Sequence, residues 1–165
     1  MVPYELDHLL GFLEETPEFI NSLTENLRGE ELREKPSQEE FSLLEHVCHL
    51  RDIEQEGYRV RINKLLNEAQ PFLPDMDGDK LARERDYNSQ NFNEALSAYA
   101  CAREDNIRTL RAAPPDLLKR TGLFEGVGVI TLERLVVMMY EHDRDHRQEL
   151  SDLTKELASD GGEQF

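Results

Sequence analysis

Two histidines spaced four residues apart, His142 and His146, are the residues of this chain best suited to chemistry. They lie in the stretch YEHDRDHRQEL near the end of the sequence. Residues four apart are neighbours on one face of a helix. Both histidines fall on a stripe of apolar residues at helical spacing, so we expect them to point toward the interior. Buried imidazoles are costly without a partner, and a divalent metal ion is a suitable one.

The spacing of this pair leaves other interpretations open. It matches the two histidines of the helical HExxH zinc motif, but Asp143 stands where that motif has its catalytic glutamate. A hydrogen-bonded or solvated histidine pair fits the spacing equally well. The charged residues around the pair are interpreted as solvated faces of the helix. These residues are Asp143, Arg144, Asp145 and Arg147.

A third ligand is available in the stretch EHVCHLRDIE, which holds His46 and His49. Periodicity slightly favours His46, which lies nearer the centre of the apolar stripe, and a site that uses both is not excluded. His8 is expected to be exposed. The nearby carboxylates are candidates for ligands, for partners that orient an imidazole, or for surface charge, and we expect surface charge for most. They are Glu45, Asp52, Glu54 and Glu56.

Four amphipathic helices are expected to position these residues. A proline in the first helix, Pro17, predicts a kink or a restart with Thr16 as the cap. Ser37 and Glu40 predict a capping box at the start of the second helix, and Thr131 is expected to cap the fourth. Signals for β-strands are weak, with GVGVIT as the only β-branched patch. The expected helices span residues 4–28, 38–69, 89–113 and 131–157.

Amphipathic helices in one chain must bury their apolar stripes against each other, so the sequence predicts an all-α, antiparallel four-helix bundle. The longest connection, residues 71–88, permits a crossover between parallel neighbours. A single domain is expected over residues 1–157. Residues 158–165 are expected to form a flexible tail.

The composition excludes several classes of protein. Lys and Arg number 19 against 35 Asp and Glu, and the net charge of −16 argues against binding to nucleic acid or to an anionic membrane. No apolar run approaches the roughly 18 residues that span a bilayer, and no signal peptide is evident, so we expect a cytoplasmic protein. Cys48 and Cys101 are too few for a disulfide scaffold and are predicted to be buried, reduced thiols.

Two long stretches resemble a known family. EKPSQEEFSLLEHVCHLRDIE, followed later by TLERLVVMMYEHDRDHRQEL, is similar to the DinB/YfiT-like family of metal-binding helical bundles, which is distinct from the DNA polymerase called DinB. The resemblance runs from about Leu9 to Leu153. The family's HLxDxE context matches the residues from His49 to Glu54, and its HxxxH matches the pair on the last helix. Phe41 replaces the family's tryptophan.

This resemblance implies a metal site made of His49, His142 and His146, with His49 preferred over His46. It implies an up-down-down-up order of the helices, and often a homodimer. The implied cofactor is a divalent metal ion, either nickel or zinc, with iron and manganese as alternatives, because three imidazoles discriminate little among these ions.

Three imidazoles around an ion leave a coordination position open, as in catalytic metal sites. A water molecule there would support a metal-dependent hydrolase, and a low-molecular-weight thiol would support an S-transferase. The substrate is expected to be a small molecule. Asp52 and Glu54 are weak catalytic candidates because they follow His49 closely. The alternatives are a non-catalytic metal-binding or stress-related protein, and a metal-free interaction module.

Overall fold

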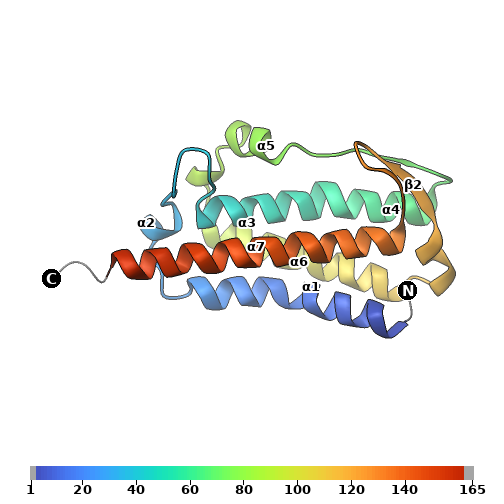
Figure 1. The fold of residues 1–165 in the computed structure, drawn as a ribbon, viewed down its shortest axis with the longest axis horizontal. Coiled ribbons are helices and arrows are strands. Elements are labelled where there is room, and N and C mark those ends of the chain that lie inside the picture. Colours follow the sequence, from blue (N-terminus) through green and yellow to red (C-terminus); the bar gives the residue numbers. More distant parts are fainter. Residues whose placement is uncertain (1–2, 162–165) are drawn as a thin grey trace.

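Four long helical rods run along the longest axis of the molecule (Figure 1). The structure, a computed structural model, describes residues 3–161, with the side chains of residues 5–161. The second rod is one continuous helix in which a π-helical turn, η1, joins α3 to α4. The rods are α1 (Pro3–Thr24), α3 (Leu43–Asp52) with η1 (Ile53–Tyr58) and α4 (Arg59–Asn67), α6 (Phe92–Ala112), and α7 (Leu132–Asp160).

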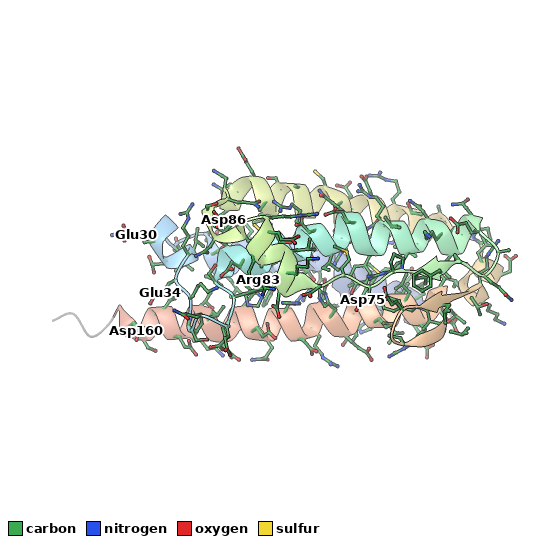
Figure 2. The ribbon with its side chains drawn as sticks, turned by 90° about the horizontal axis from the view of Figure 1, so that it is seen from above. Glu30, Glu34, Asp75, Arg83, Asp86 and Asp160 are labelled. Carbon is green, nitrogen blue, oxygen red and sulfur yellow. The ribbon has the colours of Figure 1, made fainter. Side chains whose placement is uncertain are left out.

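The order of the rods confirms the predicted up-down-down-up bundle. In Figure 1, α1 and α7 run in one direction, and the rod formed by α3 and α4 runs with α6 in the other. Because α4 and α6 are consecutive long helices that run in parallel, the chain between them must return along the whole bundle. This crossover, residues 68–91, passes over the outside of the bundle, and Figure 2 looks down on it where Asp75 and Arg83 are labelled.

Short elements fill the connections between the rods. The strands form a sheet in the order β1-β2-β3, in which β2 is parallel to β1 and antiparallel to β3. The weak β signal of GVGVIT thus corresponds to one strand of a small sheet. The short elements are α2 (Gly29–Leu32), β1 (Phe72–Leu73), α5 (Gly78–Glu84), η2 (Tyr87–Ser89), η3 (Pro115–Lys119), β2 (Thr121–Phe124) and β3 (Gly128–Thr131).

The second rod begins later than predicted. Ser42 is its N-cap: its hydroxyl accepts a hydrogen bond from the Glu45 amide at 3.1 Å, and the Glu45 carboxylate accepts one from the Ser42 amide. The prediction of a capping box at Ser37 was therefore wrong. A tertiary contact favours Ser42, since its hydroxyl also donates to the Asn88 side chain at 2.6 Å. The predicted cap of α7 by Thr131 is confirmed, with 3.1 Å from the Arg134 amide to its hydroxyl.

Helix α1 continues through Pro17, so of the two predicted alternatives, a kink or a restart, the restart with Thr16 as cap is excluded. A proline inside a helix leaves the carbonyl four residues earlier without its usual amide donor. That carbonyl belongs to Leu13, and the guanidinium of Arg103 donates to it at 2.9 Å. The Thr16 hydroxyl donates to Asp143 on α7 at 2.6 Å. Side chains from two other rods therefore stabilise the helix across its proline.

Further expectations were met only in part. Helix α7 extends to Asp160, so the expected tail is helical over residues 158–160, and residues 162–165 lie outside the described part. Cys48 is buried as predicted, whereas Cys101 is exposed on α6. Within residues 3–161, no helix combines the length and apolar character that crossing a membrane requires.

Two apolar clusters fill the interior of the bundle, and a layer of polar side chains separates them. On α1, Thr16 lies between Leu13 of one cluster and Ile20 of the other. On α7, both predicted histidine ligands lie between Met139 of the first cluster and Leu150 of the second. The polar layer is therefore part of the bundle's interior and holds the candidate site.

Candidate metal centre

Four histidines from two rods meet in this polar layer. His46 and His49 lie one turn apart on α3, and His142 and His146 lie one turn apart on α7. The rings meet in two pairs: Nε2 of His49 is 3.3 Å from Nε2 of His142, and Nδ1 of His46 is 3.0 Å from Nδ1 of His146. Because each pair is spaced by one helical turn, the two helices make two histidine–histidine contacts, one above the other.

The structure brings the three histidines of the predicted set together. His49, His142 and His146, here called the inner set, each offer a nitrogen within 4.8 Å of the others. Burial, followed by the neighbouring histidine, lowers the pKa of His49 and His146 to about 3 and that of His142 to about 4. The rings are therefore neutral at neutral pH and keep the lone pairs that a metal ion requires.

Hydrogen bonding within the protein leaves the inner set incompletely satisfied. A proton between the Nε2 atoms of His49 and His142 makes one the donor and the other the acceptor, so this contact satisfies both atoms. The Nδ1 atoms of both rings are buried and have no hydrogen-bond partner in the described part of the chain. A divalent ion would use both Nε2 lone pairs at once. Three neutral imidazole donors suit zinc or nickel in particular.

A glycine and a phenylalanine determine the shape of the site around the α3 histidines. A Cβ atom at Gly78, the first residue of α5, would lie 2.7 Å from Cε1 of His49, so only glycine fits there without displacement. The ring of Phe41 lies 5.5 Å from that of His46 and 5.7 Å from that of His49, measured between centroids. The crossover and the start of the second rod thus enclose these rings from two sides.

An open cleft of about 1040 Å³ leads to the histidines. His46, His49 and His146 line it, whereas His142 is not among the lining residues and lies deeper. The other walls include crossover residues 75–79 and Glu125 of the connection between β2 and β3. Nine lining side chains are acidic and none is Lys or Arg, while a second cavity of about 660 Å³ has both signs. The cleft therefore carries an unbalanced negative charge.

The two weak catalytic candidates, Asp52 and Glu54, do not line this cleft. Asp52 is buried and accepts hydrogen bonds from Arg51, Arg85 and Tyr87. Burial raises its pKa, but the hydrogen bonds from Arg51 and Tyr87 outweigh burial and lower it. Glu54 is fully buried, and its carboxylate accepts hydrogen bonds from Arg103 and Asn106. Both acids are therefore part of the packing of the second rod, away from the open face of the histidines.

The expectation that these carboxylates are surface charges was wrong for three of the four. Glu45, Asp52 and Glu54 are buried, because each is paired within the protein, and Glu56 alone is exposed. Glu45 closes the capping box described above and forms an ion pair with Lys35 at 3.0 Å. Except for Arg51, which is adjacent to Asp52, these partners come from other segments of the chain or belong to the cap.

A buried group of three ionic side chains, here called the ion cluster, lies in the same polar layer. Arg103 of α6 is 1% exposed, and its guanidinium donates to Asp143 at 2.6 Å and 3.0 Å and to Glu54 at 2.8 Å. The other Glu54 oxygen accepts from Asn106 at 2.9 Å. Asp143 is fully buried, so its assignment to a solvated face was wrong. Burial raises its pKa, and Arg103 reverses that effect and lowers it.

The neighbours of Asp143 divide between interior and surface. Arg144 and Asp145 are exposed, as predicted. Arg147 is partly buried instead: it donates to the Phe12 carbonyl and to the Thr16 hydroxyl, and its guanidinium carbon lies 3.8 Å from the centre of the Phe12 ring. Its apolar stem and planar head pack on α1, so it is not part of a solvated face.

Glu149 is a residue of the site that sequence reasoning did not single out. Its Oε2 atom is 3.6 Å from Nδ1 of His146 and 3.7 Å from Nε2 of His46. Burial, followed by the charges of Asp145 and Glu40, raises its pKa. The available signal was its spacing, three residues after His146 and therefore one turn further on the same face of α7.

Fold and site together define a four-helix bundle of up-down-down-up order with a histidine cluster at the floor of an open cleft. The chain belongs to the DinB superfamily, whose sequence profile matches residues 13–150. Its structure is similar to that of YfiT from Bacillus subtilis, with a TM-score of 0.87 and 19% identity over 96% of this chain and 90% of that one. YfiT is described as a probable metal-dependent hydrolase with an unusual four-helix bundle topology. A search of curated proteins gives no match.

Proposed function

We propose that this protein is a metal-dependent hydrolase of a small molecule, with a divalent ion held by the inner set. The observation that carries the proposal is the meeting of three neutral imidazoles within 4.8 Å of one another below an open cleft. The similarity to YfiT, described as a probable metal-dependent hydrolase, supports the same assignment. Zinc and nickel suit the donor set best, and iron and manganese are alternatives.

The cleft favours a catalytic ion over a purely structural one. A structural ion is typically enclosed by four protein ligands, whereas a catalytic site keeps a position open to solvent. Here the cleft reaches the rings of His49 and His146. An ion bound at such a site supplies a Lewis acid that activates water and polarises a carbonyl group. The three rings of the inner set would hold the ion. The ring of Phe41 lies beside the ring of His49.

The charge of the cleft favours hydrolysis over transfer to a thiol. Nine acidic lining residues without a Lys or Arg produce a negative potential that repels anionic molecules. Low-molecular-weight thiols that carry carboxylates would enter such a cleft against this potential. Neutral or cationic esters and amides would not be repelled by this potential. Cys48 provides no alternative nucleophile, because burial raises the pKa of its thiol to about 11.

Metal analysis and a substrate panel test this proposal. We expect one tightly bound ion per chain in the wild type, and clearly weaker binding of that ion in His49→Ala. The panel holds esters, amides and thiol conjugates. The substitution should lower hydrolysis at least roughly 100-fold, because even residues that only support a ligand contribute 10- to 100-fold. The matched control is His8→Ala, since His8 is exposed on α1. Hydrolysis that survives His49→Ala would rule out this site.

A further inference from the structure

A second group of metal-ligand side chains overlaps the inner set. His46, His146 and Glu149, here called the outer set, also offer ligand atoms within 4.8 Å of one another. His146 belongs to both sets. The outer set lies on the side of the cleft, because all three of its residues line that cleft, whereas His142 of the inner set does not. The histidine cluster therefore has a deep end and an open end.

The distance between the two histidines of the outer set is that of two ligands around one ion. Ligand atoms about 2.1 Å from an ion, at angles of about 90–110°, lie about 3.0–3.4 Å apart. The Nδ1 atoms of His46 and His146 are 3.0 Å apart, within this range. Glu149 Oε2 is 3.6 Å from His146 Nδ1, slightly beyond this range, and its side chain is exposed.

The surroundings of the outer set suit a cation that arrives from solvent. The side chain of His46 is 6% exposed, whereas that of Glu149 is 58% exposed and reachable from the cleft. Glu40 and Asp152 line the same cleft, and no lining residue carries a positive charge. Such a field raises the local concentration of divalent cations. Two imidazoles and one carboxylate prefer zinc, nickel or cobalt to magnesium or calcium.

We propose that His46, His146 and Glu149 form a second divalent-cation site, on the side of the inner set that faces the cleft. This site goes beyond the proposed hydrolase, because nothing in the hydrolytic assignment requires it. Since His146 serves both sets, filling the inner set weakens the outer one. The outer set therefore holds its ion most tightly when the inner set has been removed.

The test isolates the outer set by removing the two ligands that it does not use. The variant His49→Gln/His142→Gln is titrated calorimetrically with nickel and with zinc, and with magnesium as a control cation. We expect one nickel or zinc ion per chain and no comparable binding of magnesium. Adding Glu149→Gln should weaken nickel binding at least about tenfold, as loss of a ligand does. Adding His46→Gln should have a similar effect.

The matched control is Glu156→Gln in the same background. Glu156 is an acid of the same cleft on the same helix, seven residues beyond Glu149, and lies outside the outer set. It should change nickel affinity less than about twofold, since it contributes only to the long-range potential. Equal weakening by Glu149→Gln and Glu156→Gln would show diffuse attraction and overturn the proposal. So would a double variant that binds nickel no better than one that also lacks His46.

Circular dichroism checks that each variant is folded. If the double variant does not fold, His142→Gln alone removes the deep ligand and serves as the background for the same comparison. The result is separable from the test of the hydrolase. Loss of hydrolysis and weaker ion binding in His49→Ala report on the inner set, whereas the effect of Glu149→Gln in the absence of that set reports on the outer one.

Discussion

The polar layer of the bundle contains two buried clusters that differ in how well the protein satisfies them. In the ion cluster, each of the four carboxylate oxygens of Glu54 and Asp143 accepts a hydrogen bond from a side chain. In the histidine cluster, the Nδ1 atoms of two rings have no partner in the described part of the chain. Both clusters connect α7 to the second rod. In the ion cluster every carboxylate oxygen is paired, and only Nε of Arg103 has no partner in the described part of the chain.

This difference separates a structural role from a functional one. Buried polar groups in native proteins are almost always paired, and an exception calls for a ligand or another explanation. The ion cluster connects α6 to the second rod and to α7 and replaces the amide that Pro17 lacks. The histidine cluster presents neutral ring nitrogens that a metal ion can bind. We therefore expect mutations in the ion cluster to act on stability, and mutations in the histidine cluster to act on metal binding.

The largest expected effect is that of removing the cation from the ion cluster. Arg103→Met leaves two buried carboxylates without their charged donor, and breaking a buried pair in this way costs about 3–5 kcal/mol. We expect the free energy of unfolding, measured by urea denaturation, to fall by that amount. The control is Arg108→Met, an exposed arginine of the same helix that pairs with Glu104 and Asp105. A similar loss in both variants would contradict the structural role of the ion cluster.

A smaller effect is expected when a metal ion completes the histidine cluster. At a free zinc concentration of 100 times its Kd, binding to the folded state alone adds about 2.7 kcal/mol to the free energy of unfolding. Thermal unfolding with and without zinc measures this gain. His142→Gln should lose most of it, whereas Arg108→Met should keep it in full. If zinc stabilises the His142 variant as much as the wild type, the ion binds elsewhere.

Lowering the pH should destabilise the metal-free protein through its buried, neutral histidines. Burial, together with His146, lowers the pKa of His46 from its ordinary 6.5 to about 3, so the unfolded chain binds more protons below pH 6.5. The free energy of unfolding must therefore fall as the pH decreases from about 6.5 toward 3. For one such ring the loss is about 2 kcal/mol at pH 5.

The measurement is urea denaturation at pH 7 and pH 5 in the presence of a chelator. His46→Gln should show a smaller loss between the two pH values than the wild type. His8→Gln replaces an exposed histidine and should leave the loss unchanged. If the wild type and His46→Gln lose stability equally, the ring is not held neutral by burial.

The bundle and the inward direction of His142 and His146 could be predicted from helical spacing, whereas His49 as their partner was implied by the family resemblance. The same spacing also applies to two buried charged residues, of which Asp143 was misassigned and Arg103 was not singled out. Asp143 lies four residues after Met139 and seven before Leu150, and Arg103 lies midway between Tyr99 and Ile107, so both fall on apolar stripes. Their charge suggested a solvated face for Asp143. Its burial depends on an ion partner 40 residues away, which spacing within one helix does not reveal.

Other features had two equally good signals in the sequence or none. Ser37 with Glu40 and Ser42 with Glu45 both fit the capping-box pattern, and only the contact between Ser42 and Asn88 favours the second. The π-helical turn η1 has no sequence signature that could have been used. Glu149 could have been found from its spacing to His146. The cleft itself could not have been predicted, because the crossover that completes it brings together segments far apart in the chain.

The smallest effect concerns the contact between the crossover and the histidine cluster. A Cβ at Gly78 would lie 2.7 Å from Cε1 and 2.8 Å from Nδ1 of His49, so the ring or the start of α5 must move in Gly78→Ala. We expect zinc affinity to fall about tenfold, as when the support of a ligand is disturbed. The free energy of unfolding of the metal-free protein should change by about 1 kcal/mol or less, since the His49 ring makes few hydrogen bonds that a displacement could break.

Gly11→Ala is the matched substitution on a rod far from the cleft. An added Cβ there meets nothing within 4 Å, and alanine in a helix interior is favoured over glycine by about 0.5–1 kcal/mol. It should raise stability and leave zinc affinity unchanged, which is the reverse of the pattern expected for Gly78→Ala. If Gly78→Ala instead lowers stability and leaves zinc affinity intact, the crossover supports only the fold. The histidine cluster would then keep its geometry through α3 and α7 alone.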